Sequence, residues 1–581
     1  MNNNKNKDSF LKGALILGLA GVIVKIMGGF FRIPLGNMIG SEGMGYYQAA
    51  YPVYTLFLTL ATAGFPTAVA KLVSEKVAIG NFKGANKIFK VSHTVLFITG
   101  IISFCILFFG ADYIVTNVMK NPGALYSMKA IAPALLFVPA MSAYRGYFQG
   151  RQDMTKIAVS QVAEQFFRVV LGLTLAYLLM KSLGQTFGAA GAISGATIGS
   201  IASMLYLVFA YMLGRKERRA EIDASQRFKD ERVSYIFKKL LTVAIPITIG
   251  ASVMPLVNMI DNVIVIRRLM EAGFTYKVAN SMFGQLTGMA MATINLPAVI
   301  TTAMSMSLVP AISKAYALGN KSKARKDTKS AVKVTLLIVL PCAFGMASLA
   351  IPIMGLLFPH EPSSVGTILF TLTPCVLFLG LIQTLTGIIQ GMGKPIVPVI
   401  ALCVGMLCKI VISYTLTGIP DINVLGSAFG TVTAYFVAAM INLLYVKKHM
   451  NVNFSKKEFI IKPFITVMTM FIMVKLSYGA LVGFLGNSIS TIIAICVGGI
   501  VYVVVILGIG GIKKEEILTM PKGDKLYKLS EEYSVLSNQI VFISEKHSNA
   551  KLYSFATALF IYLIFSTISL LIWEYYNKKD R

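Results

Sequence analysis

The chain has 581 residues, of which 56% are hydrophobic and only 14% charged, and its formal net charge is +29. A soluble protein of this length would divide into several domains with about 25% charged residues, so the composition excludes that class. Apolar runs of about 20 residues, long enough to cross a bilayer core of roughly 30 Å, recur from Phe10 to Trp573. We therefore expect an all-α polytopic membrane protein, and the positive charge does not indicate a nucleic-acid partner.

The first apolar run, 11–36, follows a polar and basic N-terminus. It is longer than the apolar core of about 7–15 residues in a cleavable signal peptide, and it has no A-x-A site, so we interpret it as the first transmembrane helix. In chain order we predict fourteen core spans, near 10–36, 46–72, 90–112, 125–149, 156–180, 187–213, 236–266, 283–313, 331–357, 366–391, 396–418, 424–446, 460–483 and 488–511.

Lysine and arginine collect in alternate loops, while the other loops are nearly free of them except for Arg267, Arg268 and Lys277. Because cytoplasmic loops carry the excess of basic residues, this alternation predicts a cytoplasmic N-terminus and both ends of the fourteen-helix core in the cytoplasm. The polar tail ends in another apolar run, 552–573, which we interpret as a possible fifteenth span. An interfacial helix is the alternative.

A repeat underlies the spans. The sequence AIGNFKGANKIFK after span 2 matches ALGNKSKARKDTK after span 8 at an offset of 239, and YFQGRQDM matches IIQGMGKP at an offset of 241. The repeat predicts two parallel six-helix halves, related by a pseudo-two-fold axis along the membrane normal, with a substrate site between them. The expected parts are a first half (1–213), a cytoplasmic linker (214–235), a second half (236–450), two appended helices (451–512) and a C-terminal extension (513–581).

Enzyme, cofactor and metal motifs are missing. The stretch QGMGKP lacks the first glycine and the final hydroxyl of a phosphate loop, and the six cysteines lie in apolar segments without a C-x-x-C pair. We therefore expect a carrier without catalytic residues, cofactor or structural metal. A monomer in the bilayer is the expected state.

Charged residues inside the spans are the informative ones, because each costs at least about 2.5 kcal/mol to insert into hydrocarbon. Lys25 and Arg32 are seven residues apart in span 1 and share one helical face. Lys25 falls near the midplane, which favours function. Arg32 lies farther out, where snorkelling to the interface is an equal alternative.

Span 5 has Glu164 and Arg168 four residues apart, where they can pair along the helix. For Glu164 a structural ion pair is the alternative to a substrate role. The repeat offset of 241 places Lys409 of span 11 at the position equivalent to Arg168. Each half thus offers one cation at a matching depth, and we expect the two to face one another across a cavity.

In span 7, Asp261, Asn262 and Arg268 are predicted to share a face. Asp261 could balance a neighbouring cation, bind a proton or, with Asn262, coordinate Na⁺ through oxygen atoms. The coupling ion therefore stays open between Na⁺, H⁺ and the membrane potential alone. The candidate cations Lys25, Arg32, Arg168, Arg268 and Lys409 outnumber the two carboxylates, Glu164 and Asp261, which predicts an anionic substrate.

The chain resembles the polysaccharide-transport branch of the multidrug/oligosaccharidyl-lipid/polysaccharide exporter superfamily. It is most similar to the stage V sporulation protein B group, which is similar to lipid II flippases. The resemblance covers about Phe10 to Leu529 and is carried by FFRIPLGNMIGSEGMGYYQAAYPVY, AGFPTAVAKLVSE, RGYFQGRQDM and MPKGDKLYKL.

The resemblance implies a flippase in the bacterial plasma membrane that moves a polyprenyl-linked glycan, such as undecaprenyl-pyrophosphate-linked lipid II, to the outer leaflet by alternating access. It implies that Lys25, Arg32, Arg168 and Lys409 contact the pyrophosphate and sugar, and that spans 13 and 14 form a groove for the lipid tail. The chain departs from the group at Lys409, where some relatives place oxygen ligands for Na⁺. An antiporter for cationic drugs, an exporter of another undecaprenyl-linked polysaccharide unit and a membrane glycan polymerase are the alternatives.

Overall fold

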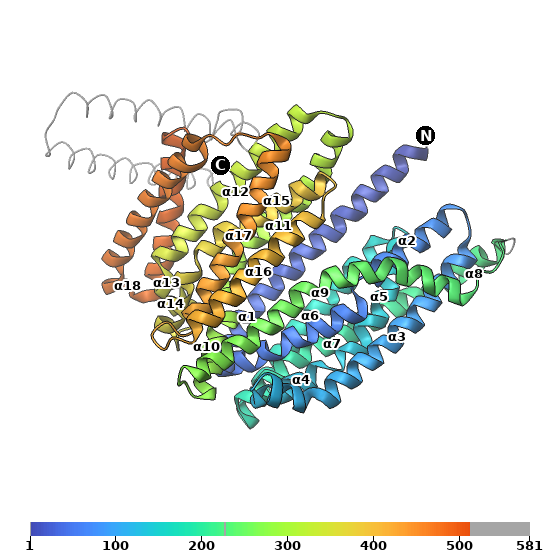
Figure 1. Cartoon of the computed structure of the whole chain (residues 1–581), viewed down its shortest axis with the longest axis horizontal. Helices are drawn as coiled ribbons and strands as arrows, with labels where there is room; N and C mark the ends of the chain where they lie inside the picture. Colours follow the sequence, from blue (N-terminus) through green and yellow to red (C-terminus); the bar gives the residue numbers. More distant parts are fainter. Residues whose placement is uncertain (1, 226–227, 512–581) are drawn as a thin grey trace, which may run out of the picture. The chain divides into compact units, whose positions relative to one another are not determined.

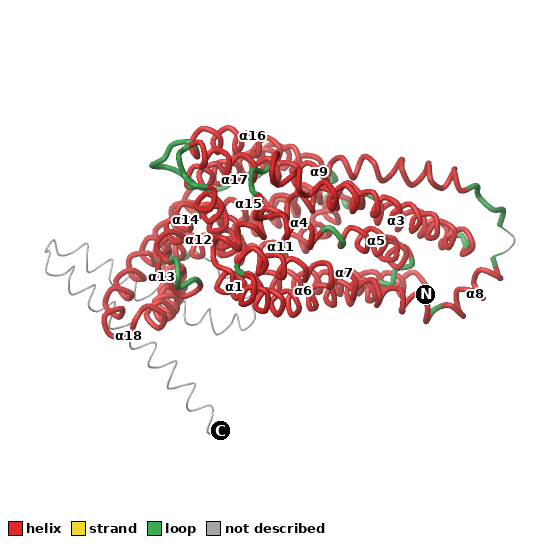
Figure 2. Tube along the Cα trace, turned by 90° about the horizontal axis from the view of Figure 1, so that it is seen from below, coloured by secondary structure: helices red, strands yellow, loops and turns green. Residues whose placement is uncertain are grey.

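The computed structural model describes residues 2–225 and 228–511, with side chains from Ile16 onward, and these residues form helices and no strand (Figure 2). Both the C-terminal extension and its apolar run at 552–573 lie outside the described residues. The helices are α1 (Asn2–Thr62), α2 (Phe65–Ala78), α3 (Phe82–Tyr113), α4 (Leu125–Ile131), α5 (Ala134–Gly150), α6 (Met154–Leu183), α7 (Gln185–Leu213), α8 (Arg215–Ala224), α9 (Val233–Glu271), α10 (Tyr276–Gly284), α11 (Met291–Ala317), α12 (Lys321–Ser348), α13 (Ala350–Leu357), α14 (Pro362–Leu372), α15 (Pro374–Gly391), α16 (Ile396–Thr417), α17 (Leu425–Met450) and α18 (Lys462–Gly508).

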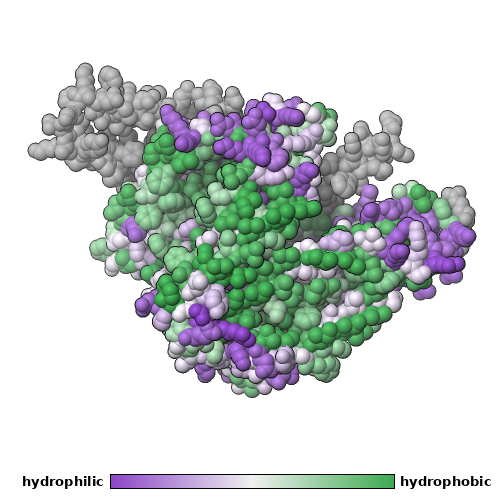
Figure 3. Space-filling model, in the orientation of Figure 1, coloured by the Kyte–Doolittle hydropathy of each residue, from purple (hydrophilic) through white to green (hydrophobic). Residues whose placement is uncertain are grey.

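Within the described residues, 12 helical segments are long and apolar enough to cross a membrane. Two of them, Ile16–Ala78 and Lys457–Gly508, have 63 and 52 residues and are interrupted by Gly40 and Gly486, whose φ angles are 66° and 69°. Figure 3 shows a broad hydrophobic face with hydrophilic side chains gathered along its margins. The all-α polytopic fold is confirmed. Counting the two long segments twice would give the fourteen crossings, a number that stays a prediction.

The chain divides into two compact units, residues 1–453 with 478–493, and residues 454–477 with the segment from 494 onward. In the first unit, α2–α7 form one group of helices, and α11, α12 and α15–α17 form another (Figure 1). Helices α1 and α9 each contact both groups, α1 through α6 and α11, and α9 through α2 and α16. Side chains of α1 and α9 can therefore line a space between the two halves.

The second unit has close contacts of its own. Gly498 lies so close to Val474 that an added Cβ would be 2.5 Å from its Cγ2 atom. Lys462 Nζ donates a hydrogen bond of 2.7 Å to the carbonyl oxygen of Gly510. The expected lipid-tail groove of these helices stays a prediction.

The two halves repeat their local geometry at the predicted offset. Asn81 caps α3 by accepting a hydrogen bond from the backbone N–H of Gly84, and Asn320 caps α12 in the same way with Lys323. The residue before each cap is a glycine in the left-handed region, with φ of 74° at Gly80 and 66° at Gly319. Asparagine is a favoured N-cap, and glycine tolerates positive φ, so both repeats begin a helix by the same physical means.

The linker is tied to loops of the first half. Arg151, at the end of α5, forms a bidentate ion pair with Glu221 of α8, with both N–O distances at 2.8 Å. Lys83 Nζ lies 3.4 Å from Asp230, and Lys76 pairs with Glu231. The linker and the loops after spans 2 and 4 therefore lie at one end of the molecule, as the charge alternation predicts.

Candidate functional site

Three of the predicted cations line one cavity between the halves. This cavity, of about 330 Å³, is lined by Lys25 and Arg32 of α1 and Arg168 of α6. The second half contributes neutral polar side chains, Asn295 and Gln383 among them. None of the described residues that line it is an aspartate or a glutamate. The cavity is thus a pocket of uncompensated positive charge.

The α1 cations reach across to the second half. Lys25 Nζ donates a hydrogen bond of 3.2 Å to the hydroxyl of Thr302, and Arg32 Nη1 donates one of 3.4 Å to the carbonyl oxygen of Thr287. Both acceptors are neutral, so both side chains keep their charge available. This geometry favours a cavity role for Arg32 over snorkelling to the membrane interface.

Arg168 is held by two tyrosines that sequence reasoning missed. Its Nη2 atom donates to the hydroxyl of Tyr47 at 3.1 Å, and its Nη1 atom donates to the hydroxyl of Tyr51 at 3.4 Å. The guanidinium carbon lies 5.2 Å from the centre of the Tyr51 ring, a cation–π distance. The tyrosines are four residues apart and stack with an interplanar angle of 10°. They orient Arg168 without neutralising it.

Glycine residues pack closely against the backbone of each of the two equivalent cations, Arg168 and Lys409. A Cβ added to Gly195 of α7 would lie 2.5 Å from the carbonyl oxygen of Arg168, and one added to Gly430 of α17 would lie 3.1 Å from that of Lys409. These contacts bring α7 against α6 and α17 against α16 in the way that small residues do in membrane helices. The backbone of each cation is therefore held by the same motif.

A second cavity, also of about 330 Å³, adjoins the first, since Arg32, Tyr51 and Asn295 line both. Lys409 of α16 and Asp261 of α9 line this second cavity. Arg168 and Lys409 thus lie in neighbouring cavities that share a wall, rather than in the single cavity that the repeat suggested.

Lys409 and Asp261 form a buried ion pair. Lys409 Nζ donates to Asp261 Oδ2 at 2.7 Å, and their side chains are 11% and 8% exposed. Within the described residues, Asp261 Oδ1 has no hydrogen-bond partner. Of the three roles open to Asp261, the geometry thus shows the first, in which its carboxylate balances the charge of a neighbouring cation, Lys409. Asn262 donates instead to the carbonyl oxygen of Ala49 and lines neither cavity.

Two other candidates lie outside the cavities. Arg268 donates to the carbonyl oxygen of Tyr414 at 2.9 Å and pairs with Glu271 at the end of α9. Glu164 does not pair with Arg168: its ion pair is with Arg145 of α5, at 2.8 Å. Neither Arg268 nor Glu164 lines either cavity.

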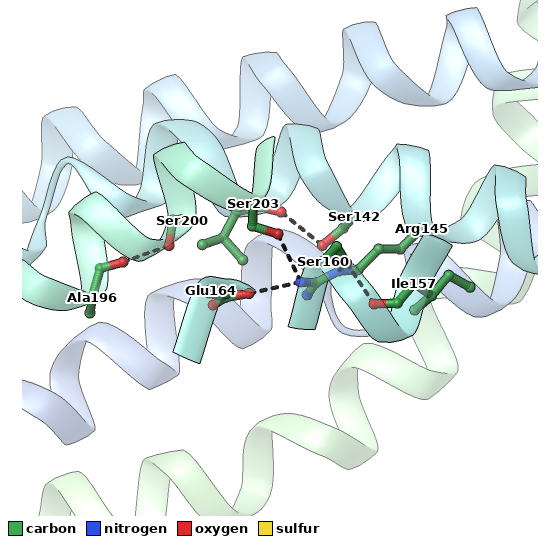
Figure 4. A network of polar contacts seen from close by, with 9 residues as sticks. Ser142, Arg145, Ile157, Ser160, Glu164, Ala196, Ser200 and Ser203 are labelled. Carbon is green, nitrogen blue, oxygen red and sulfur yellow. Dashed lines mark hydrogen bonds and ion pairs between the residues drawn. The ribbon is translucent and has the colours of Figure 1, made fainter. Parts of the chain in front are cut away.

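Arg145 is the centre of a polar network inside the first half (Figure 4). Besides Glu164, it donates to the hydroxyls of Ser160 at 3.1 Å and Ser203 at 3.2 Å, so it joins α5, α6 and α7. A partly buried cation with three fixed partners holds helices together. The geometry therefore favours the structural alternative for Glu164.

Replacing Glu164 by glutamine should destabilise the protein without weakening substrate binding. Loss of one partner of a partly buried pair costs on the order of 1–3 kcal/mol, which thermal unfolding in detergent would show as a lower Tm. The matched control is Asp153→Asn, because Asp153 pairs with Lys156 on the same helix while both are about one-third exposed, and such pairs contribute little. An unchanged Tm with loss of substrate binding would contradict the structural role.

The halves are sealed together at the end that the charge pattern assigns to the outside. Ser41 donates to Glu361 at 2.6 Å, and Asn280 donates to the carbonyl oxygen of Glu42 at 2.8 Å. The backbones also meet closely, since a Cβ added to Gly284 would lie 2.0 Å from the carbonyl oxygen of Ser41. This outer seal closes one end of the interface that contains the cavities.

Two family profiles match overlapping parts of the chain. The profile of the polysaccharide biosynthesis protein family matches residues 10–316, and that of the MatE family matches residues 246–415. The chain is 27% identical to the lipid II flippase MurJ of Bacillus subtilis (strain 168) over 452 residues, 76% of this chain and 82% of that protein.

It is also 27% identical to the stage V sporulation protein B of the same organism over 524 residues, 89% of this chain and 98% of that protein. Among solved structures, a lipid II flippase MurJ in an inward closed conformation superposes with a TM-score of 0.65 at 16% identity, covering 84% of this chain and 98% of that one. The last similarity shows a shared fold.

Proposed function

Because the chain belongs to the polysaccharide biosynthesis protein family and is a multi-pass membrane flippase or transporter, we propose that its cargo is a lipid-linked oligosaccharide carrying a pyrophosphate. The named candidate is the undecaprenyl-pyrophosphate-linked peptidoglycan precursor, lipid II, moved to the outer leaflet of a bacterial plasma membrane. The relatives named for lipid II and for sporulation support the substrate class. Exporters of other undecaprenyl-linked units share that chemistry.

The observation that carries the proposal is the charge of the first cavity. Three cations, Lys25, Arg32 and Arg168, line it with no carboxylate among the described lining residues. Like charges gathered in one cavity repel one another, and an anion with several oxygens relieves that repulsion. A pyrophosphate matches both the number and the geometry of the donors, because the guanidinium forks of two arginines can each bind phosphate oxygens in a bidentate manner.

The neutral polar side chains on the second-half side of the first cavity could bind the sugar of the cargo. Asn295, Thr302 and Gln383 of the second half offer amides and a hydroxyl opposite the cations, and such groups hydrogen-bond to sugar hydroxyl and acetamido groups. With the outer seal closed, we propose that the cavity receives the head group from the cytoplasmic leaflet. Opening of that seal, with closure of the opposite end, would release the head group outside without a chemical step.

An antiporter for cationic drugs is the second candidate, favoured by the MatE match over residues 246–415. Such a carrier needs a carboxylate that faces the cation. Asp261 is the carboxylate in the cavities, and it already neutralises Lys409. The cavities therefore fit an anion better than a cation.

Reconstituted full-length protein separates the two functions. We expect proteoliposomes to move fluorescent lipid II between leaflets and to leave the cationic dye ethidium where it is. Lys25→Ala should reduce the lipid II signal, whereas Lys277→Ala, near the start of α10 and outside both cavities, should not. Transport of ethidium with no movement of lipid II or of another undecaprenyl pyrophosphate glycan would overturn the proposal.

A further inference from the structure

The Lys409–Asp261 pair differs from the other cations of the cavities. Lys25, Arg32 and Arg168 are bound by hydroxyls and carbonyl oxygens, whereas Lys409 is bound by a carboxylate. The pair joins α16 to α9 and lines the second cavity, next to Arg32. One of the two equivalent cations, Arg168, is thus free of counter-charge, and the other is fully compensated.

The pair is incompletely bonded for its burial. An ionised carboxylate accepts hydrogen bonds at both oxygens, and an ammonium group donates three. Within the described residues, Asp261 Oδ1 has no partner, and the hydrogen bond of Lys409 is the one to Asp261 Oδ2. Since a buried ion pair is stable only when its remaining bonds are satisfied, this pair is poised to accept another group from the cavity.

An anion that enters the second cavity would compete with Asp261 for Lys409. Two anions around one ammonium group in a poorly solvated site repel each other. Protonation of the more basic anion removes this repulsion at the lowest cost in free energy. The other titratable side chains that line this cavity are Arg32, Tyr51 and Tyr435, and Cys375 lies near enough to interact with Lys409. Among these groups Asp261 is the carboxylate, so it is the group on which an added proton would relieve the repulsion between the two anions.

We propose that Lys409 and Asp261 form an exchange site, in which an oxyanion of the substrate replaces Asp261 beside Lys409 Nζ and the released carboxylate takes up a proton from water. The carboxylate becomes a carboxylic acid, the ammonium group keeps its charge, and no covalent bond of the substrate changes. This inference rests on the proposed pyrophosphate cargo. In the first half, Arg168 would then bind the anion only. In the second half, anion binding at Lys409 would be coupled to proton uptake at Asp261.

Calorimetric titration of the detergent-purified full-length protein with farnesyl-pyrophosphate-linked N-acetylglucosamine, a pyrophosphate diester whose phosphates stay fully ionised near neutral pH, tests the exchange. Titrations near neutral pH in two buffers with different ionisation enthalpies give the number of protons taken up on binding. We expect about one proton per bound probe for the wild type and about none for Asp261→Asn. The matched control is Asp421→Asn, since Asp421 is an exposed carboxylate in an outer loop of the same half, and its proton uptake should equal that of the wild type.

A double variant covers the case in which Asp261→Asn alone fails to fold because Lys409 is left buried without its counter-charge. Asp261→Asn with Lys409→Gln removes both charges together and should also bind without proton uptake. Equal proton uptake by wild type and either folded variant would overturn the exchange site, as would an absence of uptake in the wild type.

Binding affinity tests the proposed function, and proton uptake on binding tests the exchange site, so the two can fail separately. Binding of the farnesyl-pyrophosphate-linked sugar that is insensitive to Lys25→Ala and Arg168→Ala would reject the anion cavity itself. Binding that depends on Lys25 and Arg168, but with no proton uptake that depends on Asp261, would reject the exchange site alone.

Discussion

Replacing Arg168 by glutamine is expected to weaken binding of lipid II by roughly 10- to 150-fold, because hydrogen bonds to a charged group are each worth about 1.5–3 kcal/mol. Arg168 lines the first cavity without a carboxylate partner, so its charge is available to the cargo. The measurement is a titration of the purified protein with fluorescent lipid II in detergent. The loss should shrink only slightly at high salt, since the Arg168 side chain is partly buried between helices.

A graded series makes this prediction specific. Arg168→Lys keeps the charge but not the planar fork, so its affinity should fall between those of wild type and Arg168→Gln. Tyr51→Phe removes one hydroxyl partner and should cost less than the loss of the charge. The matched control is Arg267→Gln: Arg267 donates to the carbonyl oxygens of Asn117 and Val118 and lines neither cavity. Equal losses in Arg168→Gln and Arg267→Gln would show a general surface effect and contradict the site.

Replacing Gly284 by valine should prevent closure of the outer seal. An added Cβ at this residue would lie 2.0 Å from the carbonyl oxygen of Ser41 and 2.6 Å from the backbone nitrogen of Gly45. Overpacking of this kind costs about 1–3 kcal/mol or more, which shifts the balance between sealed and open conformations by roughly 5- to 150-fold. Because a carrier must visit both conformations, lipid II transport should fall by a similar factor.

Thiol labelling reports the seal directly. With the six native cysteines replaced, a cysteine introduced at Thr287, which lines the second cavity, should react faster with a membrane-impermeant reagent from outside when Gly284→Val is present. Gly250→Val is the matched control, since nothing lies within 4 Å of its added Cβ. Where Gly284→Val does not fold, Gly284→Ala makes the milder test. Unchanged labelling in a folded Gly284 variant would contradict the assignment of the seal.

Much of the cationic cavity could be predicted from the sequence. The burial cost of charge marks Lys25, Arg32 and Arg168 as functional or paired, and helical spacing places Lys25 and Arg32 on one face. The structure brings all three into one cavity. Tyr47 and Tyr51 had a signal as well, because two tyrosines four residues apart in an otherwise apolar helix share a face.

The partners of these charges could not be predicted. Asp261 and Lys409 are 148 residues apart, and Arg145 and Glu164 lie on different helices. The repeat offset predicts the depth at which Lys409 lies in the membrane, but a side chain's direction depends on the rotation of its helix against neighbours. The sequence therefore suggested that Glu164 pairs with Arg168 and that Lys409 faces Arg168, and tertiary packing chose other partners.

The sequence by itself determined that this protein is an all-α membrane protein with a twofold-repeated chain and a surplus of deep cations. These properties follow from local composition and spacing, since hydrocarbon imposes helices and penalises each charge independently of the rest of the fold. Only the tertiary structure decided which cations stay uncompensated. Whether a buried charge can attract a substrate depends on the counter-charge within a few ångströms, and for Lys409 that counter-charge comes from another helix.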